Sequence, residues 1–322
     1  MRALVVSNMQ ADTDHPERGR FVRDQVRALA ALPDLEVELF EFPPGARALA
    51  AAHAGLRRKR LAFDVVHAHF SLSALPAFAV PAAARGLTLH GTDVVHPRTR
   101  QATRALLPAI DLLVAVSQPL AQQLPGAAAR RRARVIPCGV DLERFRPIPR
   151  AQARAALGLP ADGPRLLFPA DPRRPAKRHD LALALAHAAG VPLLSLGGVD
   201  PERVPLFVNA ANAVIVPSER EGFGLAVLEA LACDVPVLAT PVGIHAAALD
   251  GLPGTLCAQF ALGAWLAALQ HPLRSPDPRV CGRERAAAFS AERMAVELAQ
   301  AWRETLATAP RRFTLEHMRR SG

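Results

Sequence analysis

The stretch NAVIVPSEREGFGLAVLEALACDVPVLATPVG, residues 212–243, decides the fold class of this sequence. Apolar runs of strand length lie near its two ends, and the Ala- and Leu-rich segment 225–233 between them has the length of a short helix. A strand, a helix and a second strand in this order form a βαβ unit, which belongs to a parallel sheet. The stretch therefore predicts an α/β protein.

Two glycines and two carboxylates of this stretch lie where a βαβ unit binds ligands. The N-terminus of the crossover helix lies at the carboxyl edge of the sheet, where its unpaired N–H groups and positive dipole end attract an anion. Gly222 and Gly224 let the backbone approach a phosphate closely. Glu229, inside the helix, is placed for the hydroxyls of a ribose, and Glu221, before the helix, for a second polyhydroxyl group. We therefore expect a diphosphate between a ribose and a sugar.

The same alternation of strands and helices extends over most of the chain. Apolar runs alternate with helical segments from residue 3 to residue 117, and the series restarts from residue 165 to residue 240. A proline-rich segment near residues 145–150 separates the two series. The sequence thus predicts two doubly wound domains, 1–147 and 148–290, followed by a helix at 291–307 with an apolar face.

Composition and charge limit the class of protein. The chain has 322 residues, 50% of them hydrophobic, which suits two domains with sizeable cores. Its net charge of +10 favours acidic partners such as phosphates, nucleotides, anionic lipids or nucleic acid, although an Arg-rich genomic composition would give the same excess. Nucleic acid is disfavoured among these, because the sequence has no Tyr and only 5% aromatic residues for stacking.

Cysteine usage and hydropathy predict a cytoplasmic protein. The four cysteines are far apart and form no C-x-x-C pair, which suits reduced thiols: Cys138, Cys233, Cys257 and Cys281. The first ten residues lack the long apolar region of a signal peptide. The most apolar stretch, 72–84, contains two prolines and is too short to cross a bilayer.

Motifs along nearly the whole chain resemble those of one enzyme family. In order, they are TLHGTDVV (88–95), LLVAVSQPL (112–120), VIPCGVDLERFRP (135–147), DPRRPAKRHDLALALA (171–186), the stretch 217–243 and FSAERMAVELAQAW (289–302). The pair Glu221 and Glu229 is similar to the E-x7-E motif of retaining glycosyltransferases of family 4, also called glycosyl transferases group 1. E-x7-E alone is a weak signal, whereas the ordered combination is specific.

The resemblance implies a fold and an activity. The fold is GT-B: two Rossmann-like doubly wound domains that face each other across a cleft, with a C-terminal helix at about 291–322 crossing back to the N-terminal domain. Domain 1–147 lies on the acceptor side, and domain 148–290 binds the nucleotide sugar. The activity is transfer of a sugar from a nucleotide-diphosphate sugar (UDP- or GDP-linked) to an acceptor, with retention of configuration and without a bound metal or other cofactor.

The resemblance also implies roles in the donor site. Glu229 resembles the ribose ligand, and Glu221 resembles the partner of the donor-sugar hydroxyls. Lys177 resembles the lysine that neutralises the departing diphosphate, which is electrostatic stabilisation of a leaving group. Backbone contacts to sugar and phosphate fall on Phe223, Gly224 and Leu225.

Other implied site residues depart in part from the family pattern. The arginine that accompanies the lysine is displaced, because Asp171 and Pro172 stand near its place and the nearest candidates are Arg173 and Arg174. In the first domain, His90 and Asp93 of the HGTD motif resemble contacts to the transferred sugar and acceptor. Gly19 resembles the glycine that opens the first long helix near the diphosphate, where the family more often has two adjacent glycines.

Each assignment has a structural alternative. Glu229 would also suit a solvated helix face, Lys177 a basic surface run, and Gly222 with Gly224 a tight turn. A single histidine after a strand, such as His90, is often a buried structural residue.

Two further patterns leave alternatives open. His67 and His69 share one face of an expected strand, as metal ligands would, but no third ligand is evident and a structural or acceptor-side role is favoured. The basic runs GLRRKR (55–60) and AARRRAR (128–134) suit either an anionic membrane surface or solvated faces. The same holds for the tail RRFTLEHMRR (311–320), so peripheral attachment to the inner membrane face is one predicted location.

Two other functions compete with a glycosyltransferase. A catalytically inactive GT-B scaffold or regulatory subunit is favoured by the displaced arginine and the short chain, and disfavoured by the presence of Glu221, Glu229 and Lys177. A nucleotide-sugar epimerase or phosphorylase of the same fold fits the HGTD and GVDLERF motifs less well. The base, the sugar and the acceptor are not encoded in one sequence, and polysaccharide, lipid-linked, cell-envelope and small-metabolite acceptors are all compatible with it.

Overall fold

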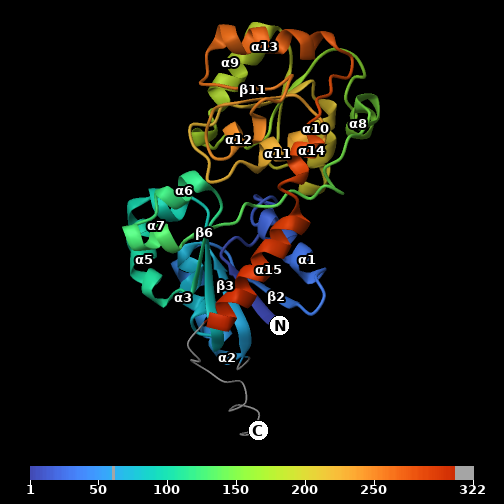
Figure 1. Ribbon diagram of the computed structural model, residues 1–322. Helices are drawn as coiled ribbons and strands as arrows, with labels where there is room; N and C mark the ends of the chain where they lie inside the picture. The colour runs from blue at the N-terminus through green and yellow to red at the C-terminus, as the bar shows by residue number, and fades with distance from the viewer. Residues whose placement is uncertain (60–61, 309–322) are drawn as a thin grey trace. The chain divides into compact units, whose positions relative to one another are not determined.

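The computed structural model describes residues 1–59 and 62–308, which fold into two compact α/β units. Among the described residues, the first unit contains Met1–Thr13, Arg18–Gly139 and the last helix up to Thr308, and the second contains Asp14–Glu17 and Val140–Ser290. Each unit has its own parallel sheet, and the chain can be followed through both by colour in Figure 1. The predicted class of two doubly wound domains is therefore confirmed.

The first unit is built on a six-stranded sheet in the order β2-β1-β3-β4-β5-β6. Every pair of neighbouring strands is parallel. The strands are β1 (Arg2–Ser7), β2 (Glu36–Glu41), β3 (Phe63–His69), β4 (Ala82–Leu89), β5 (Leu112–Ala115) and β6 (Arg134–Val135). The sequence did not predict β6, because two residues after a basic helical run are too few to show a strand period.

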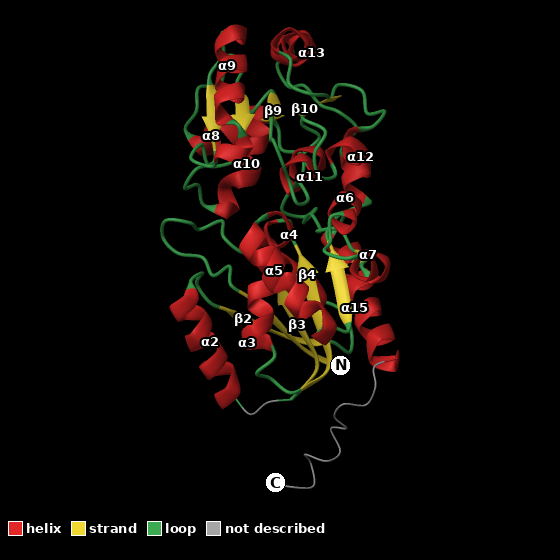
Figure 2. Cartoon of the chain, turned by 90° about the vertical axis from the view of Figure 1, so that its left-hand side faces the viewer, coloured by secondary structure: helices red, strands yellow, loops and turns green. Residues whose placement is uncertain are grey.

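Helices cover both faces of this sheet. Figure 2 shows the strands (yellow) between α2 and α3 on one side and α15 on the other. Buried residues of α1 and α15 share one apolar cluster with the strands. The helices are α1 (Arg20–Ala30), α2 (Ala46–Arg58), α3 (Ala74–Ala77), α4 (Thr92–Val95), α5 (Pro97–Leu106), α6 (Gln118–Gln122), α7 (Ala127–Arg132) and α15 (Ala291–Thr308).

The last helix, α15, returns to the first unit and is fixed there by a tryptophan. Met294, Leu298 and Trp302 are buried at the helical spacing that the sequence predicts. The indole Nε1 of Trp302 donates a hydrogen bond to Nδ1 of His67, at 2.9 Å. Full burial of such a side chain contributes about 1.5–3 kcal/mol to folding, so α15 is an integral part of this core.

The second unit is built on a five-stranded parallel sheet in the order β11-β10-β9-β7-β8. The strands are β7 (Leu166–Phe168), β8 (Leu193–Ser195), β9 (Ala213–Val216), β10 (Val237–Ala239) and β11 (Leu256–Cys257). α9 and α13 pack against one face around the buried Trp265. The helices are α8 (Arg150–Leu157), α9 (His179–Ala189), α10 (Val204–Ala210), α11 (Leu225–Ala232), α12 (His245–Leu249), α13 (Leu262–Arg274) and α14 (Arg283–Ala287).

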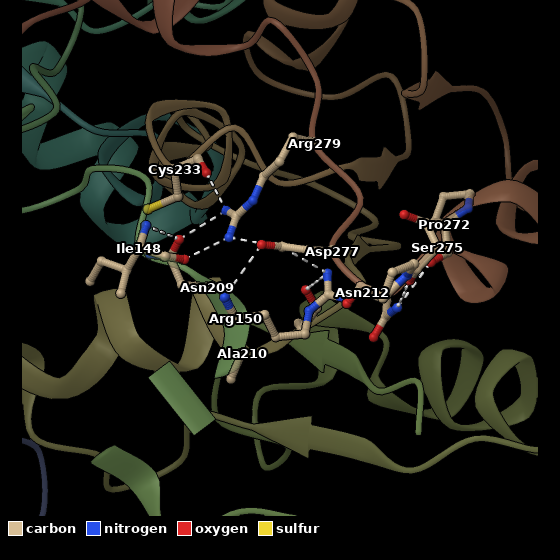
Figure 3. Close-up of polar contacts among 12 residues, drawn as sticks. Ile148, Arg150, Asn209, Ala210, Asn212, Cys233, Pro272, Ser275, Asp277 and Arg279 are labelled. Atoms are coloured by element: carbon tan, nitrogen blue, oxygen red, sulfur yellow. Dashed lines mark hydrogen bonds and ion pairs between the residues drawn. The ribbon is translucent and has the colours of Figure 1, made fainter. Parts of the chain in front are cut away.

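A buried polar network ties the start of the second unit to its helices, as Figure 3 shows. Arg150 is only 4% exposed, and its guanidinium reaches the carbonyl oxygens of Ala211 and Pro276. Asn209 accepts hydrogen bonds from the backbone N–H of Ile148, at 2.8 Å, and from Arg279, at 3.0 Å. Because these groups satisfy one another, their burial is tolerated, and no local sequence pattern reveals such a network.

The boundary between the units falls earlier than the sequence predicts. The sequence places it after residue 147, whereas the contacts divide the chain between Gly139 and Val140. The guanidinium of Arg283 donates to the carbonyl oxygens of Leu142, at 2.9 Å, and Phe145, at 2.8 Å. These bonds, made across more than a hundred residues, hold residues 140–147 to the second unit. In neither unit does any described helix combine the length and apolarity needed to span a membrane.

Candidate active site

The candidate active site of the second unit lies at the carboxyl edge of its sheet. β8 lies between β7 and β9 in sequence, but in the sheet it lies on the other side of β7, so β7 and β9 are direct neighbours. At such a topological switch point the connections leave in opposite directions and open a crevice for a ligand. Lys177 ends the 3₁₀ turn η3 (Pro175–Lys177), which follows β7, and Glu221 lies in the loop after β9. The sheet topology therefore brings together two predicted site residues from distant segments.

Lys177 and Glu221 form a nearly buried ion pair. Lys177 Nζ lies 2.5 Å from Glu221 Oε1, and the two side chains are only 16% and 10% exposed. Ser218 Oγ donates to the same carboxylate oxygen, at 2.7 Å. Burial would raise the pKa of Glu221, but the Lys177 ammonium and the hydrogen bonds from Lys177 and Ser218 keep that pKa below its usual value. Glu221 is therefore held as a carboxylate beside a fixed positive charge.

The predicted anion site at the start of α11 has the expected backbone. Gly224 is the N-cap residue of α11, with φ at 110°, a conformation that L side chains rarely adopt. The first N–H groups of α11 lie at the same sheet edge as Lys177. Gly222 and Phe223 form the turn before the cap, and Glu229 is half-buried one turn inside the helix. The predicted donor residues from 221 to 229 thus belong to one turn and one helix start.

His245 lies beneath this turn and was not predicted from the sequence. It begins α12, it is fully buried, and its Nδ1 lies 2.8 Å from the carbonyl oxygen of Thr240. A Cβ on Gly224 would approach His245 Nε2 to 2.4 Å, so only glycine fits above the ring. Burial lowers the pKa of His245, while the Thr240 carbonyl and the Glu221 carboxylate oppose that shift.

The predicted site residues of the first unit have well-defined structural partners. Gly19 is the N-cap residue of α1 with φ at 70°, and a Cβ there would collide with the carbonyl oxygen of Met9 at 2.2 Å. Asp93 is 2% exposed, and its two oxygens accept backbone N–H groups of Ser71, at 2.7 Å, and His90, at 2.9 Å. Asp93 therefore fixes the loop that carries His90, and its predicted contact with a sugar stays a prediction.

His90 is half-buried and lies beside the buried His67 and His69 at the carboxyl ends of β3 and β4. Its Nε2 lies 2.9 Å from Nδ1 of His69, and its ring packs between Phe21 and Phe70 with centroid distances of 4.9 and 4.6 Å. Burial lowers the pKa of His69 to about 3 and that of His90 well below 6.5. The rings are therefore neutral at physiological pH. Of the two predicted roles of His67 and His69, structural or acceptor-side, these contacts agree with the structural one, and the acceptor-side role stays a prediction.

A small cavity adjoins these histidines. Its volume is about 20 Å³, and His69, His90 and Thr88 line its polar side. Such a volume accommodates about one water molecule. The Nε2 atom of His69 and the Oε1 atom of Gln25, both from residues that line this cavity, have no hydrogen-bond partner among the described residues.

Sequence comparison now assigns the chain to a family. Residues 5–144 match the family described as Glycosyltransferase Family 4, and residues 176–284 match the family described as Glycosyl transferases group 1. The chain belongs to glycosyltransferase family 4. Among its relatives, the D-inositol 3-phosphate glycosyltransferase of Mycobacterium avium is 33% identical over 307 residues, which cover 80% of this chain and 71% of the relative. The enzyme of the same name from Mycobacterium tuberculosis (strain F11) is 30% identical in an alignment 344 positions long, which covers 90% of this chain and 70% of the relative.

Solved structures of this family 4 protein's neighbours show the GT-B fold. Sucrose-phosphate synthase from Thermosynechococcus elongatus has a TM-score of 0.67 at 23% identity, with 95% of this chain and 99% of that chain covered. HepE from Anabaena, in complex with UDP and glucose, has a TM-score of 0.65 at 17% identity, with 94% of this chain and 100% of that chain covered. The protein is therefore a GT-B enzyme of the glycosyltransferase class.

The two candidate arginines of this glycosyltransferase differ in their partners. Arg173 is bound by Asp171, whose Oδ2 lies 2.8 Å from Nη2 and 3.0 Å from Nε. Arg174 is exposed, and its side chain has no hydrogen-bond or ion-pair partner in the described part of the chain. Arg174 is therefore the one of the two that can turn to a phosphate without breaking an existing pair.

Two expectations concern groups that the structure of this glycosyltransferase does not decide. Over residues 1–59 and 62–308, no three His, Cys, Asp or Glu side chains come together as a metal-binding group. Metal-independent catalysis itself stays a prediction. The tail with Phe313, Leu315 and Met318 lies outside the described residues, as does the last arginine of the run 55–60.

The sequence missed Ser218, Thr240 and His245 of this glycosyltransferase, and it named His69 without its contact to His90. Ser218 holds Glu221, Thr240 holds His245, and His69 holds His90. The one feature that Ser218, Thr240 and His69 share in the sequence is their place at the carboxyl end of a strand. Polar residues at such strand ends deserve inclusion in a predicted site of an open α/β sheet.

Proposed function

We propose that this glycosyltransferase moves a sugar from a nucleotide-diphosphate sugar to an acceptor hydroxyl with retention of configuration. One observation carries the proposal: the Lys177–Glu221 pair, the N-terminus of α11 and Glu229 lie together at the switch point of the second sheet. This arrangement offers a cation and unpaired N–H groups to a diphosphate, and a carboxylate on either side for ribose and sugar hydroxyls.

The ion pair suggests how the donor is received. A diphosphate at the start of α11 competes with Glu221 for the Lys177 ammonium, which is nearly buried and therefore strongly attracted to a second anion. When Lys177 turns to the phosphates, Glu221 is released to accept hydroxyls of the donor sugar. Arg174, with no partner of its own among the described residues, adds a second positive charge on the departing diphosphate.

The chemical step follows from the same contacts. The bond between the sugar and the β-phosphate breaks, and Lys177 with the α11 N–H groups stabilises the charge that develops on the phosphate. The acceptor oxygen attacks on the face from which the phosphate leaves, and its proton passes to the leaving phosphate oxygen. Retention thus needs no covalent enzyme intermediate. His90, neutral because desolvation lowers its pKa, is proposed to hydrogen-bond the sugar rather than to act as an acid.

The relatives guide the choice of substrates to test. HepE has been crystallised with UDP and with UDP-glucose, which supports UDP-sugars as first candidates, with GDP-sugars as the second. The curated relatives are named D-inositol 3-phosphate glycosyltransferases, which supports a phosphorylated polyol among the acceptors to try, beside lipid-linked and polysaccharide acceptors. We further propose a cytoplasmic enzyme that works without a metal and whose basic runs contact anionic lipid.

A thermal-shift panel tests the donor assignment. The protein is heated with UDP, GDP, ADP and their glucose or mannose conjugates, with EDTA present, and Glu229→Ala is measured beside Glu219→Ala, an exposed neighbour. A ligand at one hundred times its dissociation constant stabilises by about 2.7 kcal/mol. We expect one base to raise Tm in the wild type and in Glu219→Ala but not in Glu229→Ala. No shift with any nucleotide in folded protein would contradict the proposal and favour the inactive scaffold.

A further inference from the structure

His245 has a ring nitrogen that the structure leaves without a partner. The side chain is 0% exposed, and Nδ1 lies 2.8 Å from the carbonyl oxygen of Thr240. Because a carbonyl can only accept, Nδ1 carries the proton, and Nε2 of the neutral ring is a bare acceptor. That Nε2 atom has no hydrogen-bond partner among the described residues. A buried polar atom without a partner costs about 1–3 kcal/mol, so its retention requires a cause.

The unpartnered nitrogen faces the N-terminus of α11. A Cβ on Gly224 would lie 2.4 Å from Nε2 and 2.6 Å from Cδ2 of His245. The edge of the His245 ring therefore packs directly against the Cα atom of Gly224, where α11 begins. The N–H groups of this eight-residue helix are the ones to which a diphosphate is assigned.

We propose that His245 is a positioning residue of the donor site that becomes protonated when the diphosphate binds, so that each donor molecule bound takes up one proton from solvent. The inference rests on the proposed function of the α11 site. The proton adds to Nε2, turns it from acceptor to donor and places a positive charge under the Gly224 turn. It stays on the ring while the donor is bound and returns to solvent when the nucleotide leaves, so no substrate bond is made or broken by His245.

The charges around His245 support this coupling. Glu221 and Lys177 are the charged groups that act on it in the structure, and they oppose each other. The elements packed against α12 contribute Glu229 from α11 and Cys257 from β11, and Arg285 of α14 donates to the carbonyl oxygen of Ala247 in α12, at 2.9 Å. In the free protein, burial lowers the pKa of His245 and keeps the ring neutral at pH 7. A diphosphate adds negative charge on the side of Nε2 and raises that pKa.

The sign of the pH dependence follows from these two pKa values. The pKa of His245 is below its usual value in the free protein and higher in the complex, so binding takes up a proton only between the two values. In that window the affinity falls as the pH rises, by up to about tenfold for each pH unit. UDP-glucose is a suitable probe, because its pyrophosphate diester does not itself titrate near neutrality, unlike the terminal phosphate of UDP.

Calorimetric titration with UDP-glucose, or with GDP-mannose if the thermal-shift panel selects GDP, measures the coupling directly. Binding enthalpies in two buffers of different ionisation enthalpy give the protons taken up per donor, at half-unit steps from pH 6 to pH 8.5. His245→Asn keeps an N–H donor for Thr240 but cannot be protonated, and His245→Gln serves if the Asn variant fails to fold. We expect the wild type to take up a substantial fraction of one proton near pH 7 and either variant to take up almost none.

A second readout needs no variant. Long-range proton–nitrogen spectra of histidine-labelled protein report the tautomer, and one buried ring should show Nδ1 protonated and Nε2 bare without donor, then both protonated with donor. Donor binding without proton uptake in the wild type, or equal uptake in the variants, would overturn this inference and leave the proposed function intact. Absence of any binding by the folded wild type would overturn both.

Discussion

Replacement of Lys177 by Met tests whether this ammonium neutralises the nearly buried carboxylate of Glu221 at the proposed donor site. Methionine retains most of the apolar stem but removes the charge 2.5 Å from Glu221. In the wild type Lys177 keeps the pKa of Glu221 below its usual value, so the carboxylate contributes stability above its unfolded pKa. In the variant the Lys177 ammonium no longer offsets the effect of burial, so the pKa of Glu221 rises. Ionised Glu221 then destabilises the fold as the pH rises.

The expected magnitude follows from the burial of the pair. Loss of one partner from a fully buried pair costs about 3–5 kcal/mol. Because the two side chains are still 16% and 10% exposed and Ser218 Oγ continues to donate to Glu221, we expect a smaller loss of unfolding free energy, about 2–3 kcal/mol at pH 7.5. Near pH 4, where Glu221 is protonated in the variant, the loss of unfolding free energy should fall below about 1 kcal/mol.

Urea denaturation of the wild type and the variant at pH 4, 5.5 and 7.5 measures this difference. Lys59→Met is a matched control, because Lys59 is exposed and its ammonium lies only over the ring of Phe40, at 5.6 Å. The reasoning fails if Lys177→Met costs the same at all three pH values, or less than the control at pH 7.5. In a donor assay the same variant should lose about 100- to 1,000-fold in kcat, as removal of one stabilising donor does.

Three further predictions concern other parts of the molecule. Arg174→Ala should lower kcat/KM about 10- to 100-fold and Arg173→Ala less than about threefold, since Arg173 is already bound by Asp171; steady-state kinetics of the two variants tests this. Trp302→Phe keeps an apolar ring but leaves Nδ1 of His67 without its donor, so urea denaturation should show about 1–3 kcal/mol less unfolding free energy, and no loss would contradict the bond. Asn212→Ala removes two donated bonds to the carbonyl oxygens of Pro272 and Ser275, at 2.9 and 3.2 Å, and should lower Tm by several degrees; an unchanged Tm would mean that the network is not needed.

The sequence predicts the sheets well because their signal is local. The strands β1 to β5 fall in the predicted series 3–117 to within one residue, β7 to β10 fall in the series 165–240, and α15 (Ala291–Thr308) agrees with the predicted helix 291–307. The two-residue strands β6 and β11 escape the period analysis. The domain boundary also escapes it, because long-range bonds from Arg283, Asn209 and Phe289 hold residues 140–147 to the second unit.

Composition gives one signal for the site that the motif alone does not. All but two of the 39 Lys and Arg residues are arginines, and Lys177 is one of the two lysines. In a chain that places arginine at nearly every basic position, a lysine at the switch point indicates a need for a compact ammonium, and the space beside Glu221 agrees with that. Lys177→Arg should therefore impair the enzyme although it keeps the positive charge. The planar guanidinium is larger and reaches farther, so it would displace Glu221 from the 2.5 Å contact between these two nearly buried side chains.

Side-chain partners explain why the remaining site residues could not be predicted. Asp93 carries the predicted motif, yet both of its oxygens are occupied by backbone N–H groups, which no spacing in the sequence discloses. His245 shows the opposite case, since nothing in its sequence neighbours marks it, yet its ring lies under the Gly224 turn. In a doubly wound domain the topology fixes which strand ends meet, so the sequence can identify the residues at those strand ends. Which of their polar atoms lack a hydrogen-bond partner depends on rotamers and long-range packing. Those unpartnered atoms determine what the site can bind.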